Sequence, residues 1–369
     1  MTQSFFIASE IYRRSHFGVK HPLGIARVST VLDMTRRLGL CTALNYKTSP
    51  RANLSLLNGF HDWEYLKALE DVEKSQVATQ EIQTRFQIGT LSNPVFPDML
   101  RRPATSVGGS LLAAELIAQG GRAYALGGGL HHGMADRANG FCFLNDLVFA
   151  IRRLRALGIE RIAYVDIDAH HCDGVEAVFK GDRDILMVST HEAKRWPFTG
   201  QIEANARDHL LNIPLPRNTH DAEFIHVFER LIQPMLDRFQ PQAIVIQGGA
   251  DALRGDPLSR LNLTNNALWS VLHRLLDYAD RILLTGGGGY NPWTVARLWT
   301  GFWAILSGQR IPQVLGEDVL SILNGLTWHR REEAQRKCVY SLFDAKQSLH
   351  LRSEIKTLVE HLRDVHGLK

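Results

Sequence analysis

The stretch RIAYVDIDAHHCD, residues 161–173, passes from an apolar run directly into five ionisable side chains. Its apolar part predicts a strand that lies in or beside the core. A surface loop could carry the charged groups freely, but buried charges need a partner or a metal ion. The stretch therefore predicts a core strand that ends at a functional site. The ionisable residues are Asp166, Asp168, His170, His171 and Asp173.

Apolar runs of strand length recur along the chain. The other four lie at 122–126, 184–189, 242–247 and 281–285. Apolar residues at helical spacing predict helices at 145–158 and 221–239, and the pair Asn291-Pro292 opens another that Gly308 closes. Strands that alternate with helices favour an α/β fold with a mostly parallel sheet covered by helices on both faces. No repeat, low-complexity tract or linker is visible, which favours a single domain.

The composition excludes several classes of function. The chain has 369 residues, of which 45% are hydrophobic and 22% charged, as in ordinary globular enzymes. A net charge of +4 over this length is too dilute to indicate nucleic-acid binding. No run of 18 apolar residues and no basic amino-terminal signal pattern is present, so we expect no membrane partner and a cytoplasmic location. The composition does not determine the oligomeric state.

The cysteines suggest neither a disulfide framework nor a thiolate metal site. Cys41, Cys142, Cys172 and Cys338 are far apart and form no CxxC pair. A metal ion must therefore be held by oxygen and nitrogen ligands. Cys172 stands inside the acidic cluster, where a small buried thiol that packs is favoured over a nucleophile.

Chemical groups follow four of the predicted strands. The residues just beyond the strand ends are His131, His132, Asp168, His170, Asp251 and Tyr290. In open α/β sheets ligands bind at the carboxyl ends of the strands, so these segments are expected to converge on one crevice. The glycine runs 127–129 and 286–289 allow close backbone approach, although ordinary turns are the alternative. Neither run matches a phosphate loop or a dinucleotide fingerprint.

The spacing of the acidic cluster indicates a metal site. In an extended chain, Asp166, Asp168 and His170 point to the same side. Asp168 and His170 supply one oxygen and one nitrogen, and Asp251 would complete a three-ligand site with an open position, as catalytic zinc requires. Two carboxylates cancel the charge of a divalent ion. The bound water would then be acidified less than in a site of three histidines, and a separate general base is expected.

The histidine pair is the candidate for that base. His132 is the preferred residue, with His131 beside it, and carboxylates that orient histidines also raise their basicity. Asp166 and Asp173 are available for this purpose. Tyr290, on a glycine-rich loop, could donate a hydrogen bond to an oxyanion opposite the metal. Each residue alone could have only a structural role, but their common position at strand ends favours a catalytic site.

Ordered motifs extend these observations over most of the chain. They are HPLGIARV (21–28), FHDWEYLKAL (60–69), GGGLHHG (127–133), GFCFLND (140–146), DIDAHHCDGVEAVF (166–179), GGADALRGDPL (248–258) and GGGGYN (286–291). In this order they resemble the signatures of the histone deacetylase superfamily, which includes bacterial acetoin-utilisation and acetylpolyamine deacetylase-type members. The resemblance implies the arginase–deacetylase α/β fold. It also implies zinc-dependent hydrolysis of an N-acetyl amide, with acetyl-lysine or a small acetylated amine as substrate.

The resemblance also assigns roles to residues. It implies one zinc ion (Zn2+) per chain, held by Asp168, His170 and Asp251. The implied catalytic residues are His132 as general base, His131 as electrostatic or acid partner, Asp166 and Asp173 as orienting acids, and Tyr290 as the group that polarises the carbonyl. The implied substrate residues are the tunnel residues Gly140, Phe141 and Leu258, with Arg27 in an internal cavity beyond them. A potassium (K+) site is implied at Asp166, Asp168, His170 and Ser189.

Two segments depart from the family pattern. The usual Phe-Pro-Gly-Thr-Gly is replaced by WPFTG at 196–200, so the second aromatic wall is expected to be Trp196, with Phe198 as the alternative. The rim segment 86–96 lacks the acidic residue with which many relatives bind the substrate backbone, and Ser92 or Asn93 stands nearby. We therefore expect small acylated amines to be used at least as well as peptides.

The sequence divides into a catalytic domain at 1–310 and a carboxyl-terminal extension at 311–369. Apolar residues at helical spacing in 355–365 predict a helix in this extension, and packing on the same domain is favoured over oligomerisation. Two other functions fit less well. A binuclear-manganese ureohydrolase of the same fold would give no role to the histidine pair or Tyr290, and a non-catalytic acyl-ligand binder would not need the base or the tyrosine.

Overall fold

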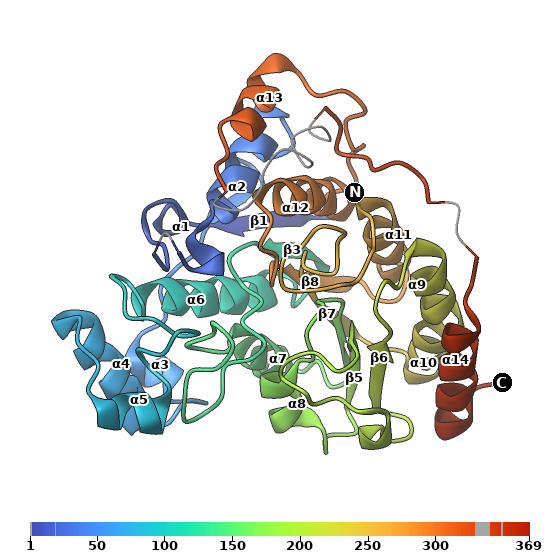
Figure 1. Cartoon of the computed structure of the whole chain (residues 1–369), viewed down its shortest axis with the longest axis horizontal. Helices are drawn as coiled ribbons and strands as arrows, with labels where there is room; N and C mark the ends of the chain where they lie inside the picture. Colours follow the sequence, from blue (N-terminus) through green and yellow to red (C-terminus); the bar gives the residue numbers. More distant parts are fainter. Residues whose placement is uncertain (1, 19, 329–339, 348–349) are drawn as a thin grey trace.

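A parallel β-sheet of eight strands forms the centre of the molecule (Figure 1). The computed structural model describes residues 2–18, 20–328, 340–347 and 350–369, so Cys338 and part of the extension predicted at 311–369 lie outside the described residues. The strand order is β2-β1-β3-β8-β7-β4-β5-β6, and each neighbouring pair is parallel. The strands are β1 (Ser4–Ala8), β2 (Tyr46–Thr48), β3 (Gly121–Ala125), β4 (Ile162–Asp166), β5 (Ile185–Glu192), β6 (Leu210–Leu215), β7 (Ala243–Gln247) and β8 (Arg281–Thr285).

Helices cover both faces of the sheet, as predicted. Successive residues of β4 enter different cores: Ile162 and Tyr164 pack on one face, and Ala163 and Val165 pack on the other. This alternation follows from the two-residue period of a strand. One face is covered by α6 (Arg101–Leu116), α7 (Asp146–Ala156) and α8 (Asp173–Phe179). The other is covered by α2 (Val28–Arg37), α9 (Asp221–Val227), a π-helical turn (Phe228–Ile232), α10 (Gln233–Phe239), α11 (Asn265–Leu275) and α12 (Pro292–Leu306).

The amino-terminal third adds a smaller helical layer. Its helices have their own apolar cluster, in which Phe17, Phe96 and Phe143 pack together with ring centroids 4.4–6.2 Å apart. Phe143 belongs to the loop that leads into α7, so this cluster supports a segment next to the strand ends. The elements of this part are α1 (Ile11–Arg14), a 3-10 turn (Pro22–Gly24), α3 (Leu54–Leu57), α4 (Trp63–Ser75) and α5 (Gln80–Phe86).

All five predicted strands are present, and three others were missed. The β1 segment is a short apolar run that periodicity alone does not distinguish from other buried segments. In β6, Asn212 and Pro214 interrupt the strand pattern, and the proline is tolerated because β6 lies at the edge of the sheet. The β2 strand has only three residues.

The carboxyl-terminal residues lie against the helices of the main body. In α14 (Ser353–His366), the side chains of Ile355, Val359 and Leu362 are buried in the same apolar core as the α9–α12 face. The buried Arg297 of α12 donates hydrogen bonds to backbone carbonyls of 341–343. Two further elements are a 3-10 turn (Ile202–Ala204) and α13 (Glu317–Asn324). None of the helices in the described part of the chain is long and apolar enough to cross a membrane.

Candidate active site

The four strands that precede the candidate residues are neighbours at the centre of the sheet. Their order is β3-β8-β7-β4, and all four are parallel. Their carboxyl ends therefore meet at one edge. The segments that follow them carry His131 and His132, Tyr290, Asp251, and Asp168 and His170 respectively. The structure thus brings together the four segments that were expected to converge.

Asp168, His170 and Asp251 form a buried cluster that can hold a metal ion. One ligand atom from each lies within 4.8 Å of the other two. His170 Nδ1 is 3.2 Å from Asp168 Oδ1 and 3.0 Å from Asp251 Oδ2. A Cβ added at Gly249 would lie 2.1 Å from Asp168 Oδ2, and one at Gly288 would lie 2.1 Å from Asp251 Oδ2, so only glycine leaves room for these carboxylates. The donor set and its cradle fit a divalent ion with an open coordination position.

The expectation of an extended chain through this cluster was wrong. Strand β4 ends at Asp166, and the chain then bends. The Asp168 amide donates to Asp166 Oδ1, and the His170 amide donates to Asp168 Oδ1, both over 3.0 Å. These side-chain-to-backbone bonds hold the chain in the bend beyond the last residue of the strand. They direct Asp166 away from the metal-binding cluster, toward His131.

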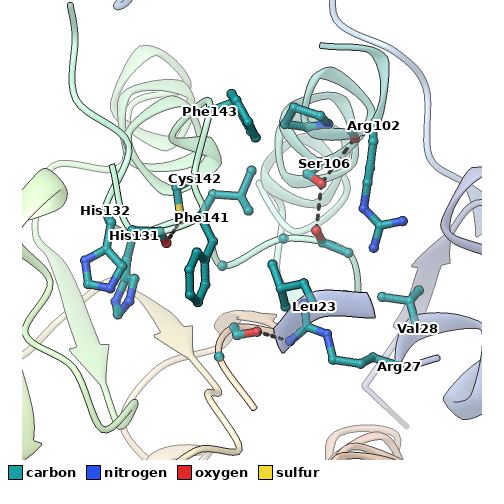
Figure 2. A pocket seen from close by; sticks show the side chains of 18 of the residues that line it. Leu23, Arg27, Val28, Arg102, Ser106, His131, His132, Phe141, Cys142 and Phe143 are labelled. Carbon is teal, nitrogen blue, oxygen red and sulfur yellow. Dashed lines mark hydrogen bonds between the residues drawn. The ribbon is translucent and has the colours of Figure 1, made fainter. Parts of the chain in front are cut away.

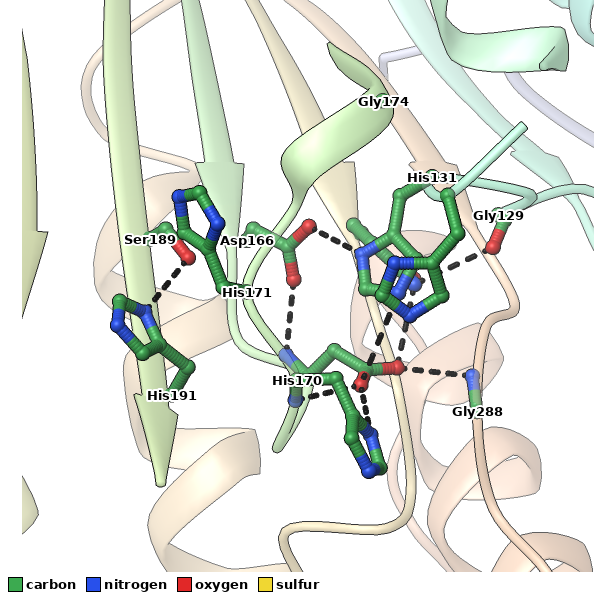
Figure 3. Close-up of polar contacts among 12 residues, drawn as sticks. Gly129, His131, Asp166, His170, His171, Gly174, Ser189, His191 and Gly288 are labelled. Carbon is green, nitrogen blue, oxygen red and sulfur yellow. Dashed lines mark hydrogen bonds and ion pairs between the residues drawn. The ribbon is translucent and has the colours of Figure 1, made fainter. Parts of the chain in front are cut away.

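Each histidine of the pair is bonded to its own carboxylate, and Figure 3 shows the bond between His131 and Asp166. His131 Nδ1 lies 2.8 Å from Asp166 Oδ2, and His132 Nδ1 lies 2.6 Å from Asp173 Oδ1. Asp173 also accepts a hydrogen bond of 2.8 Å from Asn139. In both histidines Nδ1 is bonded, which leaves Nε2 for a ligand or a reacting group.

The two histidines differ in charge. Burial lowers the pKa of His131, but the nearby carboxylates of Asp166 and Asp168 outweigh this effect and raise the pKa to about 9. Burial lowers the pKa of His132 to about 4, and the positive charge of His131 adds to the shift against the opposing effect of Asp173. Near neutral pH, His131 is therefore protonated and His132 is neutral and able to accept a proton.

The backbone before the histidine pair is fixed by a buried carboxylate. Asp146, at the start of α7, accepts hydrogen bonds from the amides of Gly129 and Leu130 and from the hydroxyl of Ser110. Gly129 has φ +95°, and a Cβ there would come within 2.8 Å of the backbone of Gly286. The two glycine runs therefore cross closely, as close packing of the loops requires.

Tyr290 is buried against Phe141, with ring centroids 5.7 Å apart. Its amide donates a 2.7 Å hydrogen bond to Asp256 Oδ2, and the other oxygen of Asp256 accepts the Leu258 amide over 2.8 Å. Burial, together with the negative charges of Asp251 and Asp168, keeps the pKa of Tyr290 well above its ordinary value. The phenol is therefore protonated and can donate a hydrogen bond.

A pocket of about 260 Å³ leads to these groups from the surface. It is lined by Ser92, His132, Gly140, Phe141, His170, Arg195, Trp196, Pro257, Leu258 and Tyr290. Gly140 has φ +53°, and a Cβ there would lie 2.2 Å from Trp196 and 2.7 Å from His132. Phe198, the alternative candidate for the second wall, does not line this pocket. Its side chain is 65% exposed, so Trp196 occupies the wall position.

Arg27 lines an inner cavity of about 50 Å³, which shares His132, Gly140, Phe141 and Tyr290 with the surface pocket (Figure 2). Its guanidinium donates hydrogen bonds to the carbonyls of Gly287 and Gly289, over 2.7 and 3.3 Å. Arg102, Ser106 and Phe141 line the same cavity. The family resemblance assigned Arg27 to an internal cavity, and its role there stays a prediction.

Ser189 lies beside the cluster. It pairs in register with Asp166 across β4 and β5, and its hydroxyl lies 3.0 Å from His191 Nδ1 (Figure 3). The four candidates for a potassium site therefore come from two neighbouring segments. Among the described residues, only Asp168, His170 and Asp251 form a group of three or more acidic, histidine or cysteine side chains with metal-ligand geometry.

Sequence reasoning missed several supporting residues. Gln247 Nε2 donates to Asp168 Oδ2 over 3.2 Å, and the Gly288 amide donates to the same oxygen over 2.9 Å. Asp256 and Asn139 fix Tyr290 and Asp173, as described above. Gln247 stands next to the motif at 248–258 and Asp256 stands inside it, but neither belongs to a metal-ligand or histidine pattern.

The histone deacetylase domain matches residues 21–306 of this chain. The chain belongs to the histone deacetylase family. It is similar to the acetoin utilization protein AcuC of Bacillus subtilis, with 33% identity over 84% of this chain and 83% of AcuC. It is also similar to the histone deacetylase clr6 of Schizosaccharomyces pombe, with 31% identity over 81% of this chain and 76% of clr6.

Solved structures of the family agree in fold. The crystal structure of a histone deacetylase homologue from Aquifex aeolicus superposes with a TM-score of 0.93 and 30% identity, over 98% of this chain and the whole of that chain. A histone deacetylase homologue complexed with SAHA gives the same values. The family match confirms the predicted superfamily, and the eight-stranded parallel sheet confirms the predicted fold class.

Proposed function

We propose that this protein is a zinc-dependent deacetylase that removes an acetyl or short acyl group from an N-acylated amine. The observation that carries the proposal is the meeting of three elements at the inner end of one pocket. These are the cluster of Asp168, His170 and Asp251, the neutral His132, and the phenol of Tyr290. Each supplies something that amide hydrolysis needs.

The chain's own residues divide the chemistry among them. A divalent ion bound by the cluster supplies Lewis acidity, which polarises a carbonyl and acidifies a water molecule. Because Asp173 binds Nδ1 of His132 and fixes its tautomer, Nε2 would be free to accept a proton from an attacking water molecule. Tyr290 donates a hydrogen bond to the carbonyl oxygen as negative charge develops on it. His131, bonded to Asp166, lies beside these groups as the electrostatic or acid partner.

The pocket supports a narrow substrate chain. Phe141, Trp196 and Leu258 provide apolar walls for a methylene chain such as that of lysine. The outer segment, 86–96, carries no acidic side chain that could bind the amides of a peptide backbone. We therefore assign acetyl-lysine and small acylated amines as the substrate class, with no requirement for flanking peptide.

The other two functions are less well supported. A binuclear-manganese ureohydrolase needs ligands for a second ion, and the described residues contain one such cluster. A pure acyl-ligand binder would not need a neutral histidine held by a carboxylate at the point where a proton must be removed.

We also propose a potassium ion near Asp166, Asp168, His170 and Ser189. We propose as well that the chain divides into a catalytic part, 1–310, and an extension, 311–369, that packs on it.

Turnover by the zinc-loaded protein tests the proposal. Release of acetate from an acetyl-lysine peptide, an acetylpolyamine and a small acetyl amide is measured side by side. We expect acetate from at least one of them and none from the zinc-free protein. Urea release from a guanidino substrate, or absence of turnover with all acetylated substrates, would contradict the proposal.

A further inference from the structure

Two cavities meet at the mouth of the tunnel. The tunnel is the pocket of about 260 Å³ that leads to His132 and Tyr290. It shares Ser92, Gly140 and Trp196 with a neighbouring cavity of about 500 Å³. The neighbouring cavity is also lined by Thr84, Arg85, Gln87, Thr90, Leu91, Asn93, Arg137, Ala138 and Asn139. If an acyl-amine chain enters the tunnel, the rest of the substrate has room to extend into this second cavity.

The charged side chains in the lining of the two cavities are arginines and histidines. Arg195 lines the tunnel, and Arg85 and Arg137 line the second cavity. No aspartate or glutamate is among the described residues that line either cavity. The lining therefore offers guanidinium donors to an anion, while the carboxylates bonded to these arginines line neither cavity. Planar guanidinium groups bind carboxylates with two parallel hydrogen bonds.

Arg195 is held in a fixed position. Its Nε and Nη2 donate hydrogen bonds of 2.8 and 2.7 Å to the carboxylate of Glu192, which is 3% exposed. The same carboxylate accepts the amide of Arg260 over 2.8 Å, which ties Arg195 to the segment that carries Leu258. No described residue bonds to Nη1 of Arg195, so its two N–H groups are available to a ligand. A donor that is ordered before binding loses little entropy on binding.

The other two arginines are paired only on the surface. Arg137 is bonded to Asp136 and Arg85 to Glu64, and all four side chains are at least 44% exposed. Exposed ion pairs of this kind contribute little free energy. A substrate carboxylate can therefore replace either partner at small cost.

We propose that the substrate carries a carboxylate on the carrier side of its acylated amine, and that Arg195 binds this carboxylate with Arg137 and Arg85 as secondary contacts. This inference rests on the proposed deacetylase function and narrows its substrates to acylated amino acids and related acids. Acylated polyamines, whose carrier end is cationic, are disfavoured. The carboxylate can belong to a free small molecule or to an acidic side chain near an acetyl-lysine in a polypeptide.

Three substrates with the same acylated chain test the inference. They are Nα,Nε-diacetyl-lysine with a free carboxylate, its neutral amide, and monoacetylcadaverine, which is cationic. We expect kcat/KM of the acid to exceed that of the amide by about tenfold, since a charge-assisted hydrogen bond has about this strength. The cationic amine is expected to be the poorest of the three. Acetyl-lysine peptides with and without an adjacent glutamate show which source of carboxylate is preferred.

Variants assign the effect to Arg195. Arg195→Gln is expected to abolish the preference for the acid over the neutral amide. Lys194→Gln removes the same charge from the neighbouring residue, which is exposed and lines neither cavity, and is expected to keep the preference. Because Arg195→Gln leaves Glu192 without its partner, Arg137→Gln serves as a second variant and is expected to lower the preference about threefold, as loss of an exposed contact does.

Equal kcat/KM for acid and amide in the unmodified protein would overturn the inference, as would equal effects of Lys194→Gln and Arg195→Gln. If none of the substrates is turned over, the proposed function fails and the inference is still decided. Dissociation constants of the acid and the amide for the Tyr290→Phe protein, measured by calorimetry, then serve as the test. A lower dissociation constant for the acid than for the amide would support the carboxylate site, and equal dissociation constants would overturn it.

Discussion

The inner end of the tunnel and its mouth are built in different ways. At the inner end, Asp168, His170 and Asp251 are buried, and neighbouring side chains or backbone amides bond to each of them. At the mouth, Trp196 is 37% exposed and Leu91 is 98% exposed. Buried polar groups that fully satisfy one another tolerate little change, whereas exposed side chains can vary at small cost in stability. We therefore expect changes at the inner end to affect the reaction itself and changes at the mouth to affect the choice of substrate.

The largest effect is expected from a change in the metal-binding cluster. Asp251→Ala should lose the divalent ion and all measurable turnover, because it removes one of the three ligands and leaves only Asp168 and His170 to hold the ion. Metal content per chain, measured by mass spectrometry on the purified protein, tests this. Undiminished metal in Asp251→Ala, or two tightly bound ions in the unmodified protein, would contradict a single three-ligand site.

The next effect concerns residues that act without binding the metal. Tyr290→Phe should lower turnover by about 10²–10³ through loss of an oxyanion donor, and His132→Ala by about 10²–10⁴ through loss of the base. Both variants should keep the metal and the fold. Steady-state rates and metal content are compared with those of the unmodified protein. A nearly normal rate in Tyr290→Phe would show that another group polarises the carbonyl.

A pH effect on stability is expected from a histidine that supports the inner end. His61 Nδ1 lies 2.9 Å from the Met134 carbonyl, and its Nε2 accepts the Asn145 amide, so it joins two parts of the segment between β3 and α7. Burial lowers the pKa of His61 from 6.5 to about 4. The unfolded chain therefore binds a proton below pH 6.5 and the folded chain does not. Folding stability should fall as the pH decreases from about 6.5 to about 4, by on the order of 3 kcal/mol.

Denaturant unfolding at several pH values measures this dependence. His61→Gln cannot titrate and serves as the control, because the other histidines of the chain are unchanged. The difference in slope between the two proteins isolates His61. Equal slopes would show that the protonation state of His61 does not change on unfolding in this pH range.

The smallest effect is expected at the mouth. An acetyl-lysine peptide should have an advantage in kcat/KM of less than about tenfold over the single acetyl-lysine amide, since segment 86–96 offers only neutral side chains to a peptide backbone. Steady-state kinetics with both substrates provide the measurement. A larger advantage would mean that another loop binds the peptide and that the mouth is more ordered than its exposure indicates.

Much of the site could be predicted from the sequence because its residues occur in short ordered motifs next to strand patterns. The positions of His131, His132, Asp168, His170, Asp251 and Tyr290 after predicted strands required only local patterns of apolar residues. The neutral character of segment 86–96 was equally visible. Local spacing also predicted the helical regions within 145–158 and 221–239, since an amphipathic helix is encoded within a few turns.

Only the tertiary structure decided which segments become neighbours. The central order β3-β8-β7-β4 and the insertion of β1 between β2 and β3 depend on pairing between residues far apart in the chain. The same holds for the pairing of Asp166 with His131 and for the support that Asp256 gives to Tyr290. The choice of Trp196 over Phe198 depends on a contact with Gly140. Local sequence determines the period and chemistry of each segment, but contacts across the sheet depend on packing of the whole chain, which no single segment encodes.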